Sequence, residues 1–224
     1  MTERREGEPV ALLDIRNLSV VYQTQRGTVK AVDSVSLDLQ PVQHLGVIGE
    51  SGCGKSTLLR ALVRVLPRNC RITSGEIWFE GRDLLALSEM EMRDLRWREI
   101  AIVPQASMDS LDPVQRVGHQ LEEILTVRGA YDRGAAKRRA ADLFELVGLS
   151  VDRLSNYPHE FSGGMKQRAV IAMALALQPS LLIADEPLTA LDVIVQHQVL
   201  EVLRRLEDEL KLTVMLVTHD ISVV

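Results

Sequence analysis

The stretch GESGCGKS at residues 49–56 decides the fold, because it fits the pattern G-x-x-x-x-G-K-[ST] of a phosphate-binding loop. It follows a short apolar run, HLGVIG (44–49), that predicts a buried strand. It also opens a stretch with helical spacing, 55–66, which we expect to end at Pro67. Glycines let the backbone curl so that its N–H groups point at phosphate oxygens, and a helix N-terminus favours anions. This strand–loop–helix context predicts a nucleotide-binding site.

The side chains of this loop support the same prediction. Lys55 places a positive charge near the β- and γ-phosphates, and the Ser56 hydroxyl is a candidate ligand of Mg²⁺. A glycine-rich turn without function is the alternative interpretation, and the strand before the motif and the helix after it count against that alternative. The loop residues expected to contact the nucleotide are Gly49, Ser51, Gly52, Cys53, Gly54, Lys55, Ser56 and Thr57.

The composition indicates a soluble globular chain rather than a disordered one. The 224 residues are 46% hydrophobic and 25% charged, and the formal net charge of −5 gives no basic field, so no nucleic-acid partner is expected. The longest apolar stretch, residues 169–177, is about half of what a membrane-spanning helix needs, so another polypeptide must supply any spans. Cys53 and Cys70 are too few for a disulfide framework, which favours a reducing cytosol.

The first part of the chain predicts a small antiparallel sheet. Residues 11–22, 28–39 and 75–81 carry partial alternation of apolar and polar residues, as half-buried strands do. The stretch 114–158, by contrast, has mostly helical patterning with a loop signal at Gly129. This stretch therefore indicates a helical insertion in an otherwise mixed α/β chain.

The last part of the chain predicts parallel strands. The runs SLLIAD (180–185) and LTVMLVT (212–218) are typical of buried strands, and a helix is expected at about 193–210 between them. A strand–helix–strand unit implies a parallel pair of strands. The chain then stops at Val224, before anything that would close the domain.

Two acids and a histidine follow these parallel strands. Asp185 and Glu186 end the first strand, where one acid can hold Mg²⁺ and the next can take a proton from an attacking water. His219 follows the next strand, so all three lie at the carboxyl ends of strands, where such sheets bind ligands. Taken alone, a strand ending in acids, or a lone histidine, is more often structural. Their occurrence together with a phosphate loop favours function.

A second candidate phosphate-binding helix end lies in FSGGMKQR (161–168). Ser162 has the position of a helix N-cap, and Gly163 and Gly164 leave the first amides of a helix over 164–177 uncovered. Ordinary helix capping is the alternative interpretation of this motif alone. A single domain already has one phosphate-binding helix end, however, so a second one needs an explanation.

At this point the chain resembles the ABC (ATP-binding cassette) ATPases, over residues 11–224. The resemblance rests on an ordered motif set. The motifs are GESGCGKST, IVPQ ending in Gln105, FSGGMKQR, LLIADEP, ALD ending in Asp192, and THD containing His219. The fold that this implies is an α/β P-loop NTPase domain with a parallel-sheet core, an antiparallel β layer and a helical subdomain. The implied cofactors are ATP and Mg²⁺.

The resemblance also implies roles for residues around the γ-phosphate. Gln105 is the glutamine that touches Mg²⁺ and the attacking water, and its region couples to membrane-embedded permease subunits. Asp185 holds Mg²⁺ together with Ser56, Glu186 is the general base, and His219 is the switch histidine.

Other residues are implied to act on the nucleotide from further away. Ser162, Gly163 and Gly164 form the signature that contacts the γ-phosphate held by a second ATPase chain, in a homo- or heterodimer. Asp192 belongs to the loop at the dimer interface, and Tyr22 has the position of the aromatic under the adenine.

The sequence around the motifs is similar to that of ATPase subunits of dipeptide, oligopeptide and nickel importers. Phe161 in place of leucine, and Met165 and Lys166 after the glycines, are typical of this group, whereas Leu188 stands where the group usually has threonine. A complete cassette of the group continues past the switch histidine, so the chain is expected to be C-terminally truncated.

The sequence therefore predicts a single ABC ATPase domain over 1–224, with a core at 11–105 and 163–224 and a helical subdomain at 106–162. It is expected to power import of peptides or a related small solute by hydrolysing ATP. We expect it as a peripheral protein at the cytoplasmic face of the membrane, reaching an extracellular solute-binding protein only indirectly.

Two alternatives from other classes stay open at this stage. One is a soluble ABC ATPase without a transport role. The cassette is not interrupted by zinc-type cysteines, coiled-coil heptads or a long basic linker, which counts against this alternative. The other is a catalytically silent cassette that only binds nucleotide, against which the four residues Lys55, Asp185, Glu186 and His219 are all present. The transported substrate is not encoded in these motifs.

Overall fold

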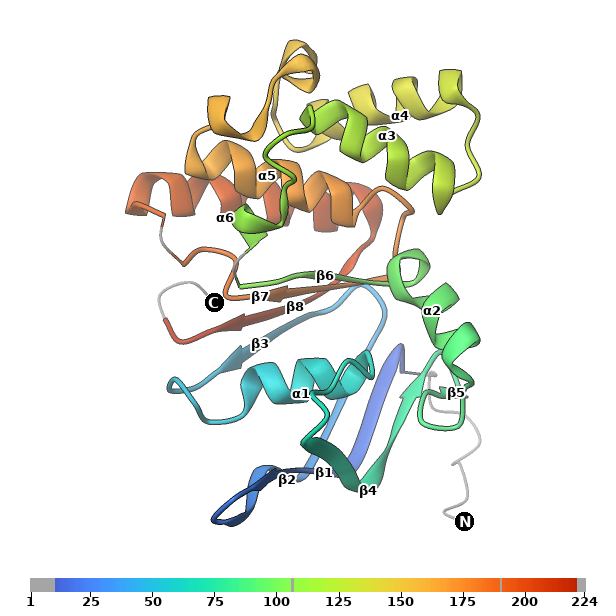
Figure 1. Cartoon of the computed structure of the whole chain (residues 1–224), viewed down its shortest axis with the longest axis vertical. Coiled ribbons are helices and arrows are strands. Elements are labelled where there is room, and N and C mark those ends of the chain that lie inside the picture. The colour runs from blue at the N-terminus through green and yellow to red at the C-terminus, as the bar shows by residue number, and fades with distance from the viewer. Residues whose placement is uncertain (1–10, 106, 190, 221–224) are drawn as a thin grey trace.

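Two kinds of strand pattern give the protein two separate sheets. The half-alternating segments form an antiparallel sheet, and the wholly apolar runs form a parallel one. The computed structural model describes residues 11–105, 107–189 and 191–220 (Figure 1). The remaining residues, which the predicted domain bounds include, lie outside the described part.

The predicted antiparallel layer is confirmed, with one strand longer than expected. Its strand order is β2-β1-β4-β5. The stretch that begins at Gly75 is the second half of β4, because Gly75 lies at an irregularity where the β1–β4 pairing shifts, with φ of 99°. A Cβ there would lie 2.5 Å from the Cα of Leu18, so only glycine fits. The strands are β1 (Leu13–Thr24), β2 (Gly27–Leu39), β4 (Cys70–Phe79) and β5 (Arg82–Asp83).

The parallel sheet contains the three predicted apolar strands and one that was not predicted. Its order is β3-β8-β7-β6, and every neighbouring pair is parallel. The unpredicted strand β6 is only four residues long, which is too short to show a periodicity. The strands are β3 (His44–Ile48), β6 (Ile100–Val103), β7 (Leu181–Asp185) and β8 (Thr213–Thr218).

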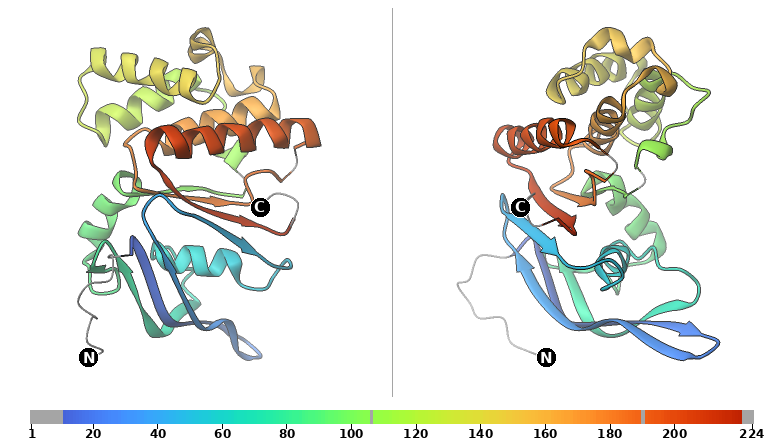
Figure 2. Two further views of the ribbon diagram at one scale, coloured as in Figure 1. Left: turned by 180° about the vertical axis from the view of Figure 1, so that it is seen from behind. Right: turned by 90° about the vertical axis from the view of Figure 1, so that its left-hand side faces the viewer.

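Helices cover both faces of the parallel sheet, and its inner strand β7 is buried on both sides. The edge strand β3, which was predicted to be buried, instead alternates exposed and half-buried residues, because only one neighbouring strand covers it. Helix α1 (Lys55–Leu62) lies between the two sheets, while α5 (Gly163–Ala174) and α6 (Val193–Leu210) cover the opposite face (Figures 1 and 2). Strand β7 shows the consequence. Leu181 and Ile183 belong to the hydrophobic core around α1, whereas Leu182 and Ala184 belong to the core with α5 and α6.

Helix α1 ends four residues earlier than the helical spacing suggested. The predicted helix over 55–66 stops at Leu62, and Arg64 has a left-handed backbone with φ of 53°. The Arg64 guanidinium donates to the carbonyl oxygens of Leu84 and Leu87, so the chain turns to reach these partners. The apolar residues that follow Leu62 continue the helical spacing without continuing the helix. Helix α5 likewise ends at Ala174 rather than at residue 177.

The predicted helical stretch is confirmed. Helices α3 (Val117–Val127) and α4 (Arg133–Leu146) are joined through Gly129 and lie beyond α5, at the top of Figure 1. Asp132 caps α4 by accepting from the amide of Ala135 at 2.8 Å. Three short 3-10 helices complete the described part of this region, at Ser107–Ser110, Val151–Ser155 and Pro158–Glu160.

Helix α2 (Glu89–Arg98), which was not predicted, connects the two sheets. It begins at a capping box in which Ser88 and Glu91 satisfy each other's backbone amides. Near its end the backbone kinks, and Trp97 has a φ of 79°, a strained value for a bulky residue. Among the described residues, no helix combines the length and the apolar character needed to cross a membrane.

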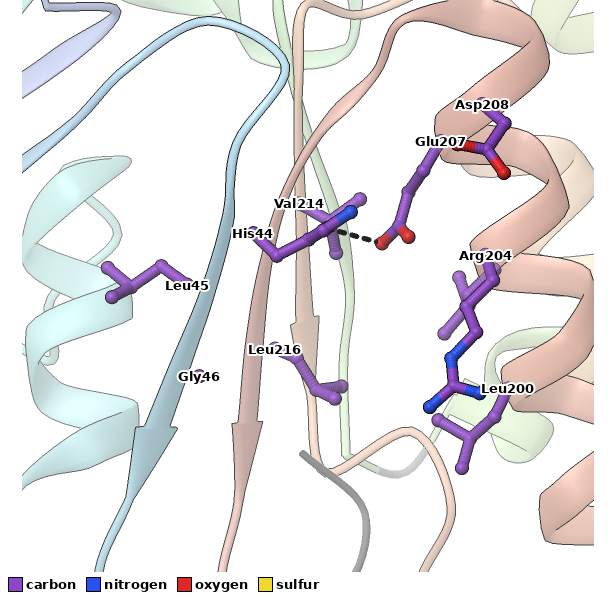
Figure 3. Close-up of a pocket in the computed structure, with 10 residues that line it drawn as sticks. His44, Leu45, Gly46, Leu200, Arg204, Glu207, Asp208, Val214 and Leu216 are labelled. Carbon is purple, nitrogen blue, oxygen red and sulfur yellow. Dashed lines mark ion pairs between the residues drawn. The ribbon is translucent and has the colours of Figure 1, made fainter.

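A groove lies between α6 and the outer part of the parallel sheet (Figure 3). His44 of β3 and Glu207 of α6 face each other across it, with His44 Nδ1 2.8 Å from Glu207 Oε1. Burial, helped by the charge of Asp208 and opposed by that of Arg204, raises the pKa of Glu207 to about 7. The apolar part of the groove wall includes Leu200, Leu203 and Leu216.

Candidate nucleotide-binding site

The carboxyl ends of three parallel strands meet at one end of the molecule. The strands β3, β8 and β7 are neighbours, with Ile48 paired to Thr218 and Asp185 paired to Val217. The helices α1, α5 and α6 all begin at this same end (Figure 1). The topology thus brings the predicted phosphate loop, the two acids and the histidine to one edge of the sheet.

The phosphate loop joins β3 to α1 and depends on glycine at its last position. Gly52 and Gly54 have φ of 83° and 106°. A Cβ on Gly54 would lie 2.1 Å from the carbonyl oxygen of Ala31, so the loop approaches β2 too closely for any side chain. Gly54 is also the N-cap of α1, where neither a side-chain cap nor an acidic residue covers the first turn. This helix end can therefore accept an anion.

The Lys55 ammonium lies inside the loop. Its Nζ donates to the carbonyl oxygens of Gly49 at 2.6 Å and Glu50 at 2.9 Å, and the residue is only 7% exposed. These contacts hold the positive charge under the curled backbone, where phosphate oxygens would lie. The proximity of Lys55 to the β- and γ-phosphates stays a prediction, and the contacts with the loop carbonyls agree with it.

Ser56 and Asp185 place two side-chain oxygen atoms next to each other beside this loop. The Ser56 hydroxyl donates to Asp185 Oδ1 at 3.4 Å. Burial is the main cause that raises the pKa of Asp185, and the charge of Glu186 adds to it, whereas the Ser56 hydroxyl opposes it. A half-buried carboxylate with a neighbouring hydroxyl suits a small hard cation, and these donor types fit Mg²⁺.

Three side chains converge on a single oxygen of Glu186. Gln105 Nε2 donates to Oε2 at 3.0 Å, His219 Nδ1 lies 3.3 Å from the same oxygen, and the Thr189 hydroxyl donates to it at 3.2 Å. The Glu186 side chain is 12% exposed, and that of His219 is 55% exposed. The structure therefore brings together Gln105, Glu186 and His219, as the resemblance implied.

Tyr22 lies next to the start of α1. Its hydroxyl is 3.3 Å from the hydroxyl of Thr57, and its backbone is central in the antiparallel sheet, paired with Val29 and Cys70. This contact places an aromatic side chain beside the phosphate loop. Ser51, Gly52 and Cys53 lie at the exposed tip of that loop.

The second helix end has the predicted cap. The Ser162 side chain accepts from the amide of Met165 at 3.4 Å, and α5 begins at Gly163. A Cβ on Gly164 would lie 2.3 Å from Cγ1 of Val195, so α5 and α6 pack closely at their first turns. Asp192 caps α6 by accepting from the amide of Val195 at 3.0 Å. Ser162 and Asp192 thus begin two neighbouring helices.

The structure does not bring all the predicted site residues together within one chain. The phosphate loop begins α1 on one face of the parallel sheet, whereas Ser162 and Asp192 begin helices on the opposite face (Figure 1). One contact of the site, from Thr189, was not predicted. The available signal was a hydroxyl residue three positions after Glu186, separated from it by a rigid Pro187.

Comparisons with known proteins agree with this geometry. The sequence profile described as "ABC transporter" matches residues 32–189. The oligopeptide transport ATP-binding protein OppD of Bacillus subtilis is 44% identical over 216 residues, which are 95% of this chain and 60% of that protein. The dipeptide transport ATP-binding protein DppD of the same organism is 43% identical over 95% of this chain and 64% of its own length.

Two further comparisons extend this result. A probable peptide ABC transporter ATP-binding protein of Sinorhizobium fredii, y4tR, is 44% identical over 99% of this chain and 68% of its own length. Among solved structures, the dimeric ATP-binding cassette MJ0796 bound to ADP and Pi has a TM-score of 0.82 and 28% identity, and covers 94% of this chain and 89% of its own. The chain thus spans 60–68% of the length of these curated relatives and 89% of one solved cassette.

These matches cover more than half of the chain. They agree with the strand order, with the phosphate loop and with the acids Asp185 and Glu186 at the end of β7. The chain belongs to the ABC transporter family, and its fold is that of an ATP-binding cassette. The α/β P-loop fold predicted from the motifs is thereby confirmed.

Proposed function

We propose that this protein hydrolyses ATP as the motor subunit of a membrane transporter that imports peptides or a related small solute. The relatives named as oligopeptide and dipeptide transport ATP-binding proteins support this proposal, and they favour transport over a soluble ABC ATPase. The protein would lie at the cytoplasmic face of the membrane, with spans supplied by permease subunits. An extracellular solute-binding protein would deliver the cargo without touching this chain.

The observation that carries the proposal is the placement of Glu186 beside the Ser56–Asp185 pair and the phosphate loop. In hydrolysis, a water oxygen bonds to the γ-phosphorus while the bond to the ADP oxygen breaks, and the water loses a proton. Glu186 accepts that proton, and Gln105 and His219, which contact its carboxylate, orient the water and the γ-phosphate.

Ser56 and Asp185 are the residues that would hold Mg²⁺, together with Gln105. When bound, Mg²⁺ neutralises charge on the β- and γ-phosphates. Lys55 contributes a second positive charge, since its ammonium already lies inside the loop. Tyr22 would pack against the adenine, at the side of the loop where its hydroxyl contacts Thr57.

The signature residues would complete the site of a second ATPase chain. Ser162 begins α5 at the surface, and Gly163 and Gly164 keep its first amides free of large side chains. Beside them, Val193 and Ile194 follow Asp192 and are 79% and 73% exposed, which is unusual for adjacent apolar residues. A dimer that covers them would also bring Ser162 to the partner's nucleotide. The dimeric MJ0796 cassette supports this arrangement.

The region around Gln105 supports a membrane partner. Pro104 lines a groove between α3 and α5 whose wall contains Trp97, Ile124, Val127 and Met173. Trp97 and Val127 are 40% and 72% exposed, so the groove offers apolar side chains to a partner. We assign this groove to the permease, and residues 106–162 to a helical subdomain that moves with it relative to the core at 11–105 and 163–224.

Replacing the general base tests the proposed function. Glu186→Gln keeps the shape of the side chain and removes the proton acceptor, so ATP turnover is expected to fall by about two to four orders of magnitude while ATP still binds. Phosphate release and binding of a fluorescent ATP analogue measure the two properties. Glu145→Gln, on the exposed surface of α4, is the matched control and should leave both unchanged.

A second variant separates binding from chemistry. Lys55→Ala removes the charge inside the loop, so the affinity for ATP itself should fall. Parental turnover in Glu186→Gln would contradict the assignment of the base. Parental ATP affinity in Lys55→Ala would contradict the assignment of the loop.

A further inference from the structure

Thr189 is tied to Glu186 twice. Its hydroxyl donates to Glu186 Oε2 at 3.2 Å, and its backbone amide donates to the Glu186 carbonyl oxygen at 3.2 Å. The two residues thus close one turn that begins directly after β7. A side chain that contacts the proposed general base from inside the same turn can act on it in every state of the protein.

The other two neighbours of this carboxylate come from elsewhere in the chain. Gln105 follows β6, and His219 follows β8. Both are proposed to contact the nucleotide or the water, so both must adjust when these bind. Thr189 differs because its distance from Glu186 is fixed by the short stretch of backbone between them rather than by tertiary packing.

The backbone of this turn is itself held in place. Glu186 has a left-handed backbone with φ of 48°, and its amide donates to the carbonyl oxygen of Val217 on β8 at 2.8 Å. A glutamate in this conformation is uncommon and is maintained by its surroundings. The turn therefore provides a rigid base from which the Thr189 hydroxyl can orient the Glu186 side chain.

We propose that Thr189 is a positioning residue for hydrolysis, acting through Glu186. Among the described residues, the three contacts fall on Oε2 and none falls on Oε1. A hydrogen bond from Thr189 to Oε2 fixes the rotation of the carboxylate, so that Oε1 is presented to the water. This inference rests on the proposed function, since it takes Glu186 as the general base.

The first test removes the hydroxyl and keeps the shape. Thr189→Val is expected to lower kcat by about 10-fold, because a freely rotating carboxylate spends less time in the productive geometry. KM for ATP and the thermal unfolding midpoint should stay at the parental values, since Thr189 is proposed to act only through Glu186 and is exposed. Thr189→Ser retains the donor and should restore most of kcat, and Thr189→Ala should repeat the loss seen with valine.

A double-mutant cycle then identifies the residue through which Thr189 acts. In a Glu186→Gln background no carboxylate is left to orient, so adding Thr189→Val should change the residual rate by less than 2-fold. A factor of 2 corresponds to about 0.4 kcal/mol, which is the usual scatter between the effects of independent substitutions. A second full 10-fold loss in that background would overturn the proposal, as would a parental kcat in Thr189→Val alone. Parental turnover in Glu186→Gln would instead overturn the assignment of the base, so the two failures are distinguishable.

Discussion

At the scale of single residues, Gly54 shows how the phosphate loop depends on its backbone. Two constraints require glycine at this position. The backbone has a φ of 106°, and an added Cβ would lie 2.1 Å from the carbonyl oxygen of Ala31. Gly27 isolates the first constraint, because it has a φ of 122° and nothing within 4 Å of an added Cβ. The two glycines therefore form a matched pair.

Gly54→Ala is expected to cost more stability than Gly27→Ala. Backbone strain alone costs about 1–3 kcal/mol, and the clash with a backbone oxygen adds to this cost only at Gly54. We expect a loss of about 1–2 kcal/mol for Gly27→Ala and of more than about 3 kcal/mol for Gly54→Ala. Urea unfolding measures both. Equal losses would show that the loop moves away from β2 at no cost.

Cys53 is an exposed thiol at the tip of the same loop, whereas Cys70 is buried in β4. A maleimide on Cys53 would fill the space of the phosphates, so labelling should abolish ATP turnover. Bound ATP should slow the labelling by covering the thiol. Mass spectrometry locates the adduct, and Cys53→Ser serves as the control that should resist inactivation. Equal labelling rates with and without ATP would contradict this placement of the thiol.

At the scale of secondary-structure elements, length and periodicity decided what the sequence could predict. The run SLLIAD predicted β7 because a strand buried on both faces is apolar throughout. Strand β6 is equally buried but only four residues long, and its existence depends on pairing with β7. Helix α1 was predicted too long, because the Arg64 contacts that end it lie in a distant loop.

The residues of the candidate site could be named from the sequence wherever they lie within a motif. The structure places Lys55 inside the loop and Ser56 beside Asp185, and their roles toward a nucleotide stay predictions. The contact of Thr189 was not predicted, because it depends on the left-handed backbone at Glu186. A glutamate at this position does not by itself indicate such a backbone conformation. Local strain of this kind is set by the surrounding strands and becomes visible only in three dimensions.

The groove between α6 and β3 predicts a dependence of stability on pH (Figure 3). The pKa of Glu207 is raised from 4.5 to about 7, so the folded state binds more protons than the unfolded state between these values. The free energy of unfolding should therefore fall as pH rises from about 4.5 to about 7, and this contribution should be flat above that. The titratable side chains that face Glu207 are those of His44, Arg204 and Asp208.

Glu207→Gln should remove this part of the pH dependence. At pH 8 the variant is expected to be more stable than the parent by about 1–3 kcal/mol, because no charge is buried, and at pH 5 the two should be similar. Glu201 is the matched control, since it pairs with His197 on the same helix but its side chain is 64% exposed. Urea unfolding across this pH range decides the matter. If the pH dependence persists in Glu207→Gln but is lost in Glu201→Gln, the Glu201–His197 pair causes it and the prediction is wrong.

At the scale of the whole molecule, the two helix ends that we propose to bind anions lie on opposite faces of one sheet. The α1 end carries Lys55, and the α5 end carries Ser162 (Figure 1). A nucleotide that touches both would have to lie between two chains, each supplying one end. This arrangement predicts that two differently damaged chains can complement each other.

The choice of variants follows from the packing. Lys55→Ala damages the loop and leaves the α5 end intact. Gly164 is unsuitable for the reverse change, because any side chain there would collide with Val195. Ser162→Asp is better, since aspartate caps a helix as well as serine but places a carboxylate where the γ-phosphate would lie. Ser162→Asn, a neutral cap of the same shape as aspartate, is its control, and it should lose less activity than Ser162→Asp because it adds no negative charge.

Mixing the two damaged chains then tests whether the site is shared. Each variant alone should hydrolyse ATP at background, because both of its sites carry the same defect. In a mixed dimer one site receives both defects and the other receives none, so activity should return, up to half the parental rate per mixed dimer if the sites act independently. Phosphate release is measured after mixing, on chains whose ATP-dependent dimerisation has been established by sedimentation. If each chain built its own site, every site in the mixture would stay damaged and activity would remain at background. Recovery with Lys55→Ala and Ser162→Asp together, and with neither alone, would therefore assign the active site to the interface.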